Sequence, residues 1–184
     1  MKRVLSAGLA GGVVLLVWFV VVNGLLGFKG RIDMKPLPDE RLVYEVLREN
    51  VPEPGKYACN PELTGDRRFI GDAPVFGVHY SGLGHDDAGR ESLVGLAVFL
   101  LAPILGAWLL SRASDGVLAR FGSRFLFFAT IGVVIGLIGF QARFGIGGYS
   151  FGDAAALTIH DIAAWAVAGL AVAGLLKPAR GRPE

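Results

Sequence analysis

The chain has 184 residues, of which 53% are hydrophobic and only 18% are charged, and its formal net charge at pH 7 is +2. Soluble domains carry about 25% charged residues, and their apolar residues do not collect into runs of about 20. The small net charge gives no support for nucleic-acid binding, and a single cysteine, Cys59, excludes an internal disulfide. The composition predicts an integral membrane protein.

Four apolar blocks predict four transmembrane helices. The first follows a basic start, is longer than the core of a signal peptide and lacks a small-residue cleavage motif, so we expect an uncleaved anchor. The third is short for a span, and we expect Arg124, Gln141 and Arg143 to snorkel from its ends. The blocks are Val4–Gly27, Leu93–Leu110, Phe125–Phe140 and Ala154–Leu176.

These blocks divide the chain into a first transmembrane helix (residues 1–27), an extracytoplasmic cap segment (28–92), and helices two to four with a cytoplasmic tail (93–184). With the N-terminus in the cytoplasm, the cytoplasmic segments are rich in Lys and Arg and hold only two acidic residues, Asp115 and Glu184. This arrangement satisfies the positive-inside rule, so we expect both ends to be cytoplasmic in a bacterial-type inner membrane.

The cap segment contains patterns for one helix and two strands. Pro38-Asp39-Glu40 precedes a helical pattern over Arg41–Asn50, with an apolar stripe that could lie on the membrane or on the rest of the cap. Lys56–Cys59 and Val75–Tyr80 are typical of short strands. A loose approach to the second span is expected around Gly82, Gly84 and Gly89. The fold class is therefore an all-α four-helix transmembrane bundle with a small α+β cap.

Small residues recur along the spans, where they let helix backbones approach closely. Packing between the helices of the chain is the favoured interpretation, and a docking face for another protein is the alternative. Pro103 is expected to bend the second span. The candidate packing residues are Gly8, Gly12, Gly132, Gly136, Gly139 and Gly169.

His160 and Asp161 form an ionisable pair inside the fourth span. Such residues face the bundle interior and have a partner, and Arg143 is the natural partner for Asp161. We favour a clamp between helices. The alternatives are a proton-relay carboxylate and a haem or metal ligand at His160, but a haem held by two residues needs a second His or Met inside a span. We therefore expect no cofactor.

The cap segment holds further possible ligands, but their spacing matches no known metal motif. Cys59 and His79 could act as nucleophile and base, yet no third orienting group is evident. Phosphate-binding and dinucleotide-binding patterns are missing from the sequence. We expect no metal site and no enzyme activity. The ligands considered are Cys59, His79, His85, Asp86 and Asp87.

Several short motifs together resemble a group of small bacterial membrane proteins that has no established activity. The stretch from Asn23 to Met34 departs from that group. The resemblance implies a four-span inner-membrane protein with an outer loop, and it implies no catalytic residue. The motifs are Gly11-Gly12-Val13-Val14-Leu15-Leu16-Val17-Trp18, Leu37-Pro38-Asp39-Glu40, Pro54-Gly55-Lys56-Tyr57, Phe76–Tyr80, and Asp161 with Trp165-Ala166-Val167-Ala168-Gly169.

Three functions remain. The leading hypothesis is a non-catalytic membrane component, either an accessory or structural subunit or an assembly factor, with the lipid bilayer and other membrane proteins as partners. The second is a small proton-coupled carrier that uses Asp161 with Arg143, and it predicts a water-accessible cavity reaching Asp161. The third is a cofactor-binding redox subunit that uses His160.

Overall fold

The computed structural model describes residues 1–33, 35–60, 71, 74–145 and 148–177, and it is mostly helical. Four of its helical segments are long and apolar enough to cross a bilayer, as the sequence predicts, and a small two-stranded sheet accompanies them. The four segments are Lys2–Leu25, Gly89–Leu110, Phe121–Arg143 and Phe151–Leu175.

The first long segment changes its helix type partway along. Helix α1 (Lys2–Trp18) continues into η1 (Phe19–Leu25), where the hydrogen bonds follow the wider π-helical pattern. Gly27 then turns the chain with a φ of 63°, a conformation that favours glycine. The short helix α2 (Phe28–Asp33) follows, inside the segment for which the sequence predicted no helix.

The other long helices extend beyond their predicted limits. Helix α4 (His85–Leu110) begins inside the glycine-rich stretch, so the predicted loose approach to the second span is confirmed at Gly82 and Gly84 and wrong at Gly89, which is helical. Acidic side chains in the first turn of α4 interact favourably with the helix dipole and support this early start. After the short helix α5 (Asp115–Ala119), α6 (Phe121–Arg143) adds residues at both ends of the predicted third span. Helix α7 (Phe151–Leu175) begins after Ser150, whose hydroxyl oxygen accepts a hydrogen bond from the helix's first turn.

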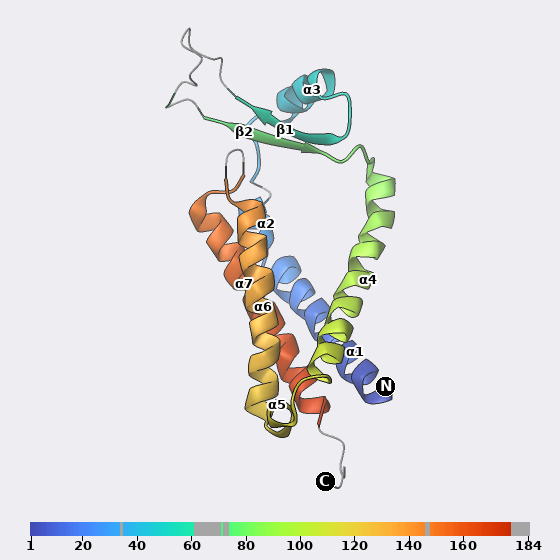
Figure 1. The fold of residues 1–184 in the computed structure, drawn as a ribbon. Helices are drawn as coiled ribbons and strands as arrows, with labels where there is room; N and C mark the ends of the chain where they lie inside the picture. The colour runs from blue at the N-terminus through green and yellow to red at the C-terminus, as the bar shows by residue number, and fades with distance from the viewer. Residues whose placement is uncertain (34, 61–70, 72–73, 146–147, 178–184) are drawn as a thin grey trace.

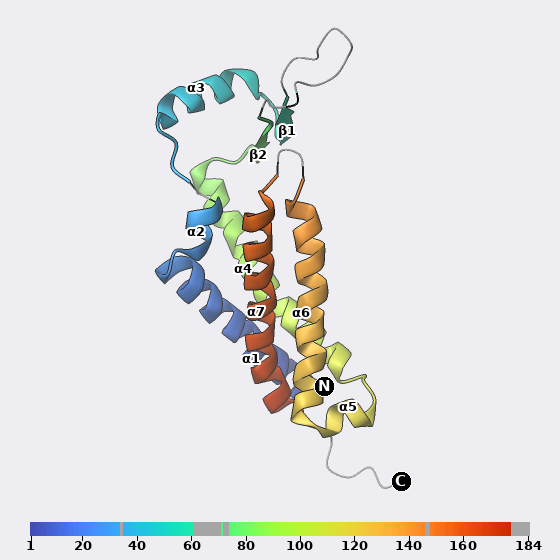
Figure 2. The same ribbon diagram turned by 90° about the vertical axis from the view of Figure 1, so that its left-hand side faces the viewer.

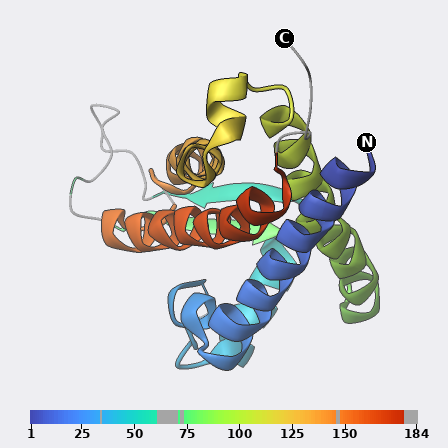
Figure 3. The same cartoon turned by 90° about the horizontal axis from the view of Figure 1, so that it is seen from below.

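The long helices do not form a symmetrical bundle. Helices α6 and α7 run side by side in opposite directions, and α1 crosses α7 at an angle (Figures 1 and 2). Helix α4 packs along α1 and diverges from α6 and α7, as the view from below also shows (Figure 3). The start of α1 and the end of α7 lie at one end of the helices, called here the terminal end, and the cap lies at the opposite end (Figure 1).

Glycines bring α1 and α4 into close contact. A Cβ atom added at Gly8 would lie 2.4 Å from the Cα of Ile104, and one added at Gly12 would lie 2.9 Å from the Cα of Leu100. Both distances are shorter than real Cβ contacts, so only glycine allows this approach. The fully buried Pro103 lies between these two contacts, on the same face of α4.

A second set of glycines joins α6 to α7. An added Cβ would lie 2.6 Å from the Cβ of Trp165 at Gly132, and 2.7 Å from Cγ1 of Ile162 at Gly136. At Gly169, on α7, it would lie 3.1 Å from the Cβ of Phe128. These glycines are thus in contact with the chain's own helices, which is the packing interpretation favoured from the sequence.

The cap consists of one helix and one strand pair. Helix α3 (Glu40–Asn50) starts at Asp39, whose carboxylate accepts a hydrogen bond from a backbone N–H of the first turn, at 3.0 Å. Strands β1 (Gly55–Cys59) and β2 (Phe76–Tyr80) pair antiparallel, which confirms the predicted strand pair.

The predicted apolar stripe of α3 is divided between two environments. Val43 and Leu47 are half-buried, and Leu47 lines a hollow together with residues of β2. Leu42 and Val46, by contrast, are exposed.

Candidate functional site

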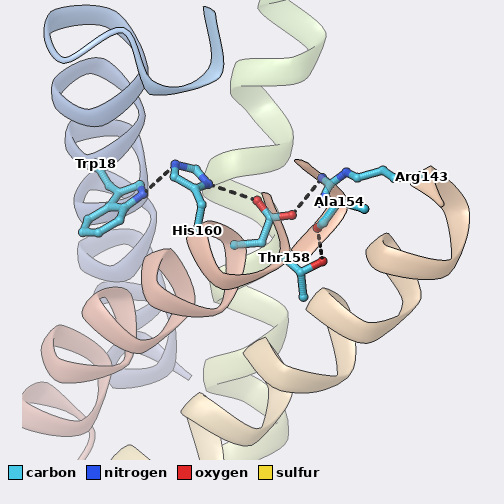
Figure 4. Close-up of polar contacts among 6 residues, drawn as sticks. Trp18, Arg143, Ala154, Thr158 and His160 are labelled. Atoms are coloured by element: carbon cyan, nitrogen blue, oxygen red, sulfur yellow. Dashed lines mark hydrogen bonds and ion pairs between the residues drawn. The ribbon is translucent and has the colours of Figure 1, made fainter. Parts of the chain in front are cut away.

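Four side chains from three of the long helices form one continuous polar chain (Figure 4). Trp18 of α1 donates from Nε1 to Nε2 of His160, at 3.0 Å. Nδ1 of His160 lies 3.2 Å from Oδ1 of Asp161. Oδ2 of Asp161 lies 2.8 Å from Nη2 of Arg143 on α6. The contact that the sequence predicts between Arg143 and Asp161 is therefore present, and the chain of contacts extends further than expected.

The contact with Trp18 fixes the protonation of His160. An indole N–H can only donate, so Nε2 of His160 must be the acceptor and Nδ1 carries the proton. Nδ1–H then donates to Asp161, and the imidazole is neutral. Phe28 stacks on the ring, with centroids 5.1 Å apart and planes 10° from parallel. Both ring nitrogens are engaged, so binding a haem or metal ion would require breaking one of these hydrogen bonds.

Helix geometry explains how Arg143 reaches Asp161. Arg143 is the last residue of α6, and side chains on a helix lean towards its N-terminus, so the guanidinium extends back along α6. It passes Gly139, where an added Cβ would lie 3.4 Å from Nη1 of Arg143. Asp161 lies ten residues into α7, about 15 Å along its axis. Gly139 therefore leaves space for the ion pair as well as for helix packing.

Sequence reasoning missed two members of the site. The first is Trp18, to which the sequence assigned no role. The N–H of a buried Trp generally has a hydrogen-bond partner, so Trp18 was a signal that an acceptor lies nearby. Phe28 was assigned to the cap segment, but α2 returns it to the ring of His160. No sequence signal indicated that return.

The polar chain borders an open cleft of about 510 Å³ lined by residues of α1, η1, α2, α4, α6 and α7. This volume falls within the range of about 300–1,000 Å³ typical of small-molecule sites. At Gly106, α4 contacts α6, since an added Cβ would lie 2.8 Å from Cε2 of Phe128. From there towards the cap, the two helices diverge and leave space for the cleft (Figure 1). Its walls are mostly apolar, and the exceptions are Asn23, Lys29, His160 and Asp161.

Asn23 is the least satisfied polar group of the cleft. Its side-chain oxygen and nitrogen are both buried, and neither has a hydrogen-bond partner among the described residues. A buried amide left in this state costs about 1–3 kcal/mol. Asn23 lies in η1 and lines the cleft beside the polar chain.

Two charged residues line the cleft, Lys29 and Asp161, and their charges are opposite. Lys29 is half-buried on α2, and Asp161 also pairs with Arg143, which lies outside the cleft lining. The charges of the lining therefore balance.

Arg124 does not snorkel from the start of α6 as expected. Its side chain is buried, because Nε donates to the carbonyl oxygen of Ala173 at 2.9 Å and Nη1 donates to that of Leu118. Ala173 lies near the end of α7, where carbonyl groups lack partners within the helix and attract cations. Arg124 therefore joins the start of α6 to the end of α7.

Cys59 and His79, on the two strands of the cap, lie apart from each other. The strand register pairs His79 with Lys56 and Cys59 with Phe76, so Cys59 and His79 lie three positions apart along the ladder, about 10 Å. Cys59 and His79, which the sequence offered only as a possible nucleophile and base, are therefore too far apart for a hydrogen bond.

The other acidic candidates of the cap lie elsewhere. Asp86 and Asp87 occupy the first turn of α4, and Asp87 pairs with Arg90 at 3.8 Å. Across the described residues, no three His, Cys, Asp or Glu side chains come together in a metal-binding arrangement.

Tyr149, between α6 and α7, has an altered acidity. Burial raises the pKa of its phenol, and the hydrogen bond to the Asp33 carboxylate raises the pKa further. The backbone N–H of Tyr149 also donates to the carbonyl oxygen of Arg143 at 2.9 Å. The loop that follows Arg143 is thus linked to α2.

These features define a class of protein: a mostly helical chain with four helices long and apolar enough to cross a membrane, a two-stranded sheet, and a cleft next to a buried polar chain. No family model matches the chain, and no curated protein or solved structure matches it. The resemblance to small bacterial four-span proteins therefore remains a prediction, and function must be inferred from the geometry.

Proposed function

We propose that the protein is a non-catalytic, four-span component of a bacterial inner membrane that works by binding an occupant in the cleft beside α4. The four apolar helices support a multi-pass membrane protein. The start of α1 and the end of α7 lie at the same end of these helices, as an even number of spans requires (Figure 1). An accessory subunit or assembly factor would act in this way, through binding alone.

Basic residues support a cytoplasmic location for the terminal end. Arg112 follows α4 and Arg120 precedes α6, so both lie at the end that holds the N-terminal Lys2 and Arg3. Short loops rich in Lys and Arg remain in the cytoplasm. The cap would then lie on the extracytoplasmic side.

The cleft is the observation that carries the proposal. The packing glycines are in contact within the chain, so the alternative of a glycine-lined docking face has lost its support. The cleft, by contrast, combines apolar walls with a buried amide that has no partner among the described residues. Pockets of this composition typically bind a ligand.

The polar chain supports a bracing role beside this cleft. A charged side chain at the centre of a membrane helix costs about 2.5–3.5 kcal/mol by insertion scales, and pairing reduces that cost. Asp161 uses one oxygen for Arg143 and the other for His160, and Trp18 extends the chain to α1. We propose that Asp161 and His160, with Arg143 and Trp18 as their partners, form a clamp. This clamp would hold α1, α6 and α7 in the arrangement that forms one side of the cleft.

The test is gentle detergent extraction from native membranes, followed by mass spectrometry of the proteins and lipids that co-purify. Gly95 lines the cleft, and nothing lies within 4 Å of a Cβ added there, so Gly95→Leu should occupy part of the cleft without a clash at Cβ. Gly174→Leu is the matched control, because Gly174 is equally open and lies outside the cleft. We expect Gly95→Leu to lose a co-purifying molecule that the control retains. An identical set for all three proteins would contradict the proposal.

A proton-coupled carrier is the second candidate, because Asp161 lines the cleft as that hypothesis requires. Its test is Asp161→Asn. Loss of uptake with unchanged protein abundance would favour the carrier, and a collapse of abundance would favour the clamp. The cofactor-binding alternative has weaker support, since both ring nitrogens of His160 are engaged.

A further inference from the structure

We propose that α2 is a movable latch at the cap end of the cleft. Side-chain contacts hold α2 against α7 and the loop that precedes α7. Release of these contacts would let α2 turn about Gly27 and open the cleft towards the cap. This inference rests on the proposed binding function of the cleft, and it adds the way in which an occupant enters.

Helix α2 has little besides side-chain contacts to hold it in place. It has six residues, and none of them is buried. A helix of this length is not stable by itself, and the backbone of α2 packs mainly on η1, which directly precedes it. Segments with few buried contacts open more readily than the rest of a fold. The position of α2 therefore depends on the side chains that it extends to its neighbours.

Two inner contacts join the start of α2 to the polar chain. Phe28 stacks on the imidazole of His160, with centroids 5.1 Å apart. Lys29 lines the cleft together with Asp161, and the two opposite charges attract each other. These contacts place α2 beside α7 at the cap end of the long helices (Figure 2). Movement of α2 would therefore remove Lys29 from the cleft lining and uncover one face of the His160 ring.

Two outer contacts join the end of α2 and the residues after it to the start of α7. Asp33, the last residue of α2, accepts a hydrogen bond from the phenol of Tyr149. Nζ of Lys35 lies 3.6 Å from Oδ2 of Asp153, in the first turn of α7. Exposed ion pairs and single hydrogen bonds each stabilise a structure only slightly, so such contacts break and re-form readily. Neither outer contact uses a residue of the cleft lining.

Gly27 provides the hinge. Its φ of 63° turns the chain between η1 and α2, and glycine can move from this conformation to others at little steric cost. No atom of the described residues lies within 4 Å of a Cβ added at Gly27, or of one added at Gly24 or Gly30 on either side. Hinge motion requires only a few residues that can absorb a change of φ and ψ. The chain around Gly27 meets this requirement.

The experiment measures how fast a charged thiol reagent enters the cleft of the full-length protein in lipid nanodiscs. Cys59 is the single cysteine of the chain, so Cys59→Ser provides a background without thiols. In this background Gly95→Cys places a reporter in the cleft lining, where an added Cβ meets no atom within 4 Å. Val94→Cys is the matched control, because Val94 is 67% exposed and lies outside the lining. A charged reagent avoids lipid, so its reaction rate reports a path open to water.

Removal of the outer contacts should open the latch. We expect Tyr149→Phe with Lys35→Gln to raise the modification rate of Gly95→Cys about tenfold, because one hydrogen bond and one ion pair are lost. Arg31→Gln, on the same helix but outside the four contacts, should leave the rate unchanged. Lys35→Asp should raise the rate by repulsion from Asp153. Exchange of both charges, as Lys35→Asp with Asp153→Lys, should lower the rate again.

Amide hydrogen exchange is the second measurement. Exchange in α2 should be faster in the variant that lacks both outer contacts than in the unaltered protein, whereas exchange in the middle of α7 should not change. Equal modification rates at Gly95→Cys with and without the outer contacts would overturn the latch, and so would unchanged exchange in α2. A rise in rate shared by Val94→Cys would also overturn it, because general loosening of the helices would then explain the result.

The outcomes separate this inference from the proposed function. If modification did not depend on the outer contacts but Gly95→Leu still lost a co-purifying molecule, the latch would fail and the binding cleft would stand. If modification depended on the outer contacts but Gly95→Leu lost nothing, the latch would stand and the proposed function would fail.

Discussion

The contact between α1 and α4 at Gly8 provides the sharpest quantitative test of the fold. In Gly8→Ala, the new Cβ would lie 2.4 Å from the Cα of Ile104, whereas ordinary contact begins at 3.4 Å. The neighbouring atom belongs to the backbone, so no rotamer change can relieve the clash and the helices must separate by about 1 Å. A gap of that size forfeits about a quarter to a half of each dispersion contact.

These effects combine to a measurable loss of stability. Overpacking costs about 1–3 kcal/mol, and we expect the upper end because the backbone must move. The better helix propensity of alanine offsets about 1 kcal/mol. We therefore expect Gly8→Ala to lower the free energy of unfolding by about 2 kcal/mol. For a chain of this size that corresponds to a Tm lower by about 4–8 °C.

The assay is thermal unfolding of the purified protein in detergent, followed by tryptophan fluorescence. The control is Gly174→Ala in α7, where an added Cβ would meet no atom within 4 Å. Propensity alone should leave this control as stable as the wild type or more stable. Equal Tm values for the two variants would refute the close approach of α1 and α4, and with it the position of α4 that forms the cleft.

Three further predictions concern polar groups. Arg124→Leu should lower the free energy of unfolding by about 1–3 kcal/mol, because it leaves the carbonyl groups of Ala173 and Leu118 without this donor, and urea titration in detergent would measure it. Trp18→Phe should release Nε2 of His160 and shift its ¹⁵N chemical shift by NMR, and an unchanged shift would exclude the hydrogen bond. The phenol of Tyr149 should ionise above pH 10, as measured by absorbance, and Asp33→Asn should bring its pKa closer to the ordinary value. Because the folded pKa of Tyr149 is raised, its contribution to stability is present below the unfolded pKa. That contribution is lost as pH rises through the folded pKa.

The sequence was sufficient for the features that depend on local composition. Apolar runs defined the four long helices, and the antiparallel strand pair followed from short β-rich segments. The contact between Arg143 and Asp161 was also predictable, because an ionisable group in an apolar helix requires a partner and Arg143 was near. Each of these inferences needed only one or two neighbouring elements.

The cleft depends on information that the sequence does not display locally. It arises because Gly8 and Gly12 hold α4 close to α1 while nothing comparable holds α4 to α7 near Gly95. The partners Trp18 and Phe28 also depend on how α1, η1 and α2 return to His160. A periodic pattern identifies the face of a helix but not its distance from a helix far along the chain.

The π-helical segment η1 has a consequence for the angular phase of everything that follows it. A wider turn holds about one residue more than an α-helical turn, so the residues beyond it are rotated relative to a continuous α-helix. Each residue of an α-helix advances by about 100°. Removal of a single residue between Phe19 and Leu25 would therefore turn Asn23 and the start of α2 to a different side of the axis. The number of residues in η1 therefore sets whether the amide of Asn23 and the ammonium group of Lys29 on α2 face the same space as His160.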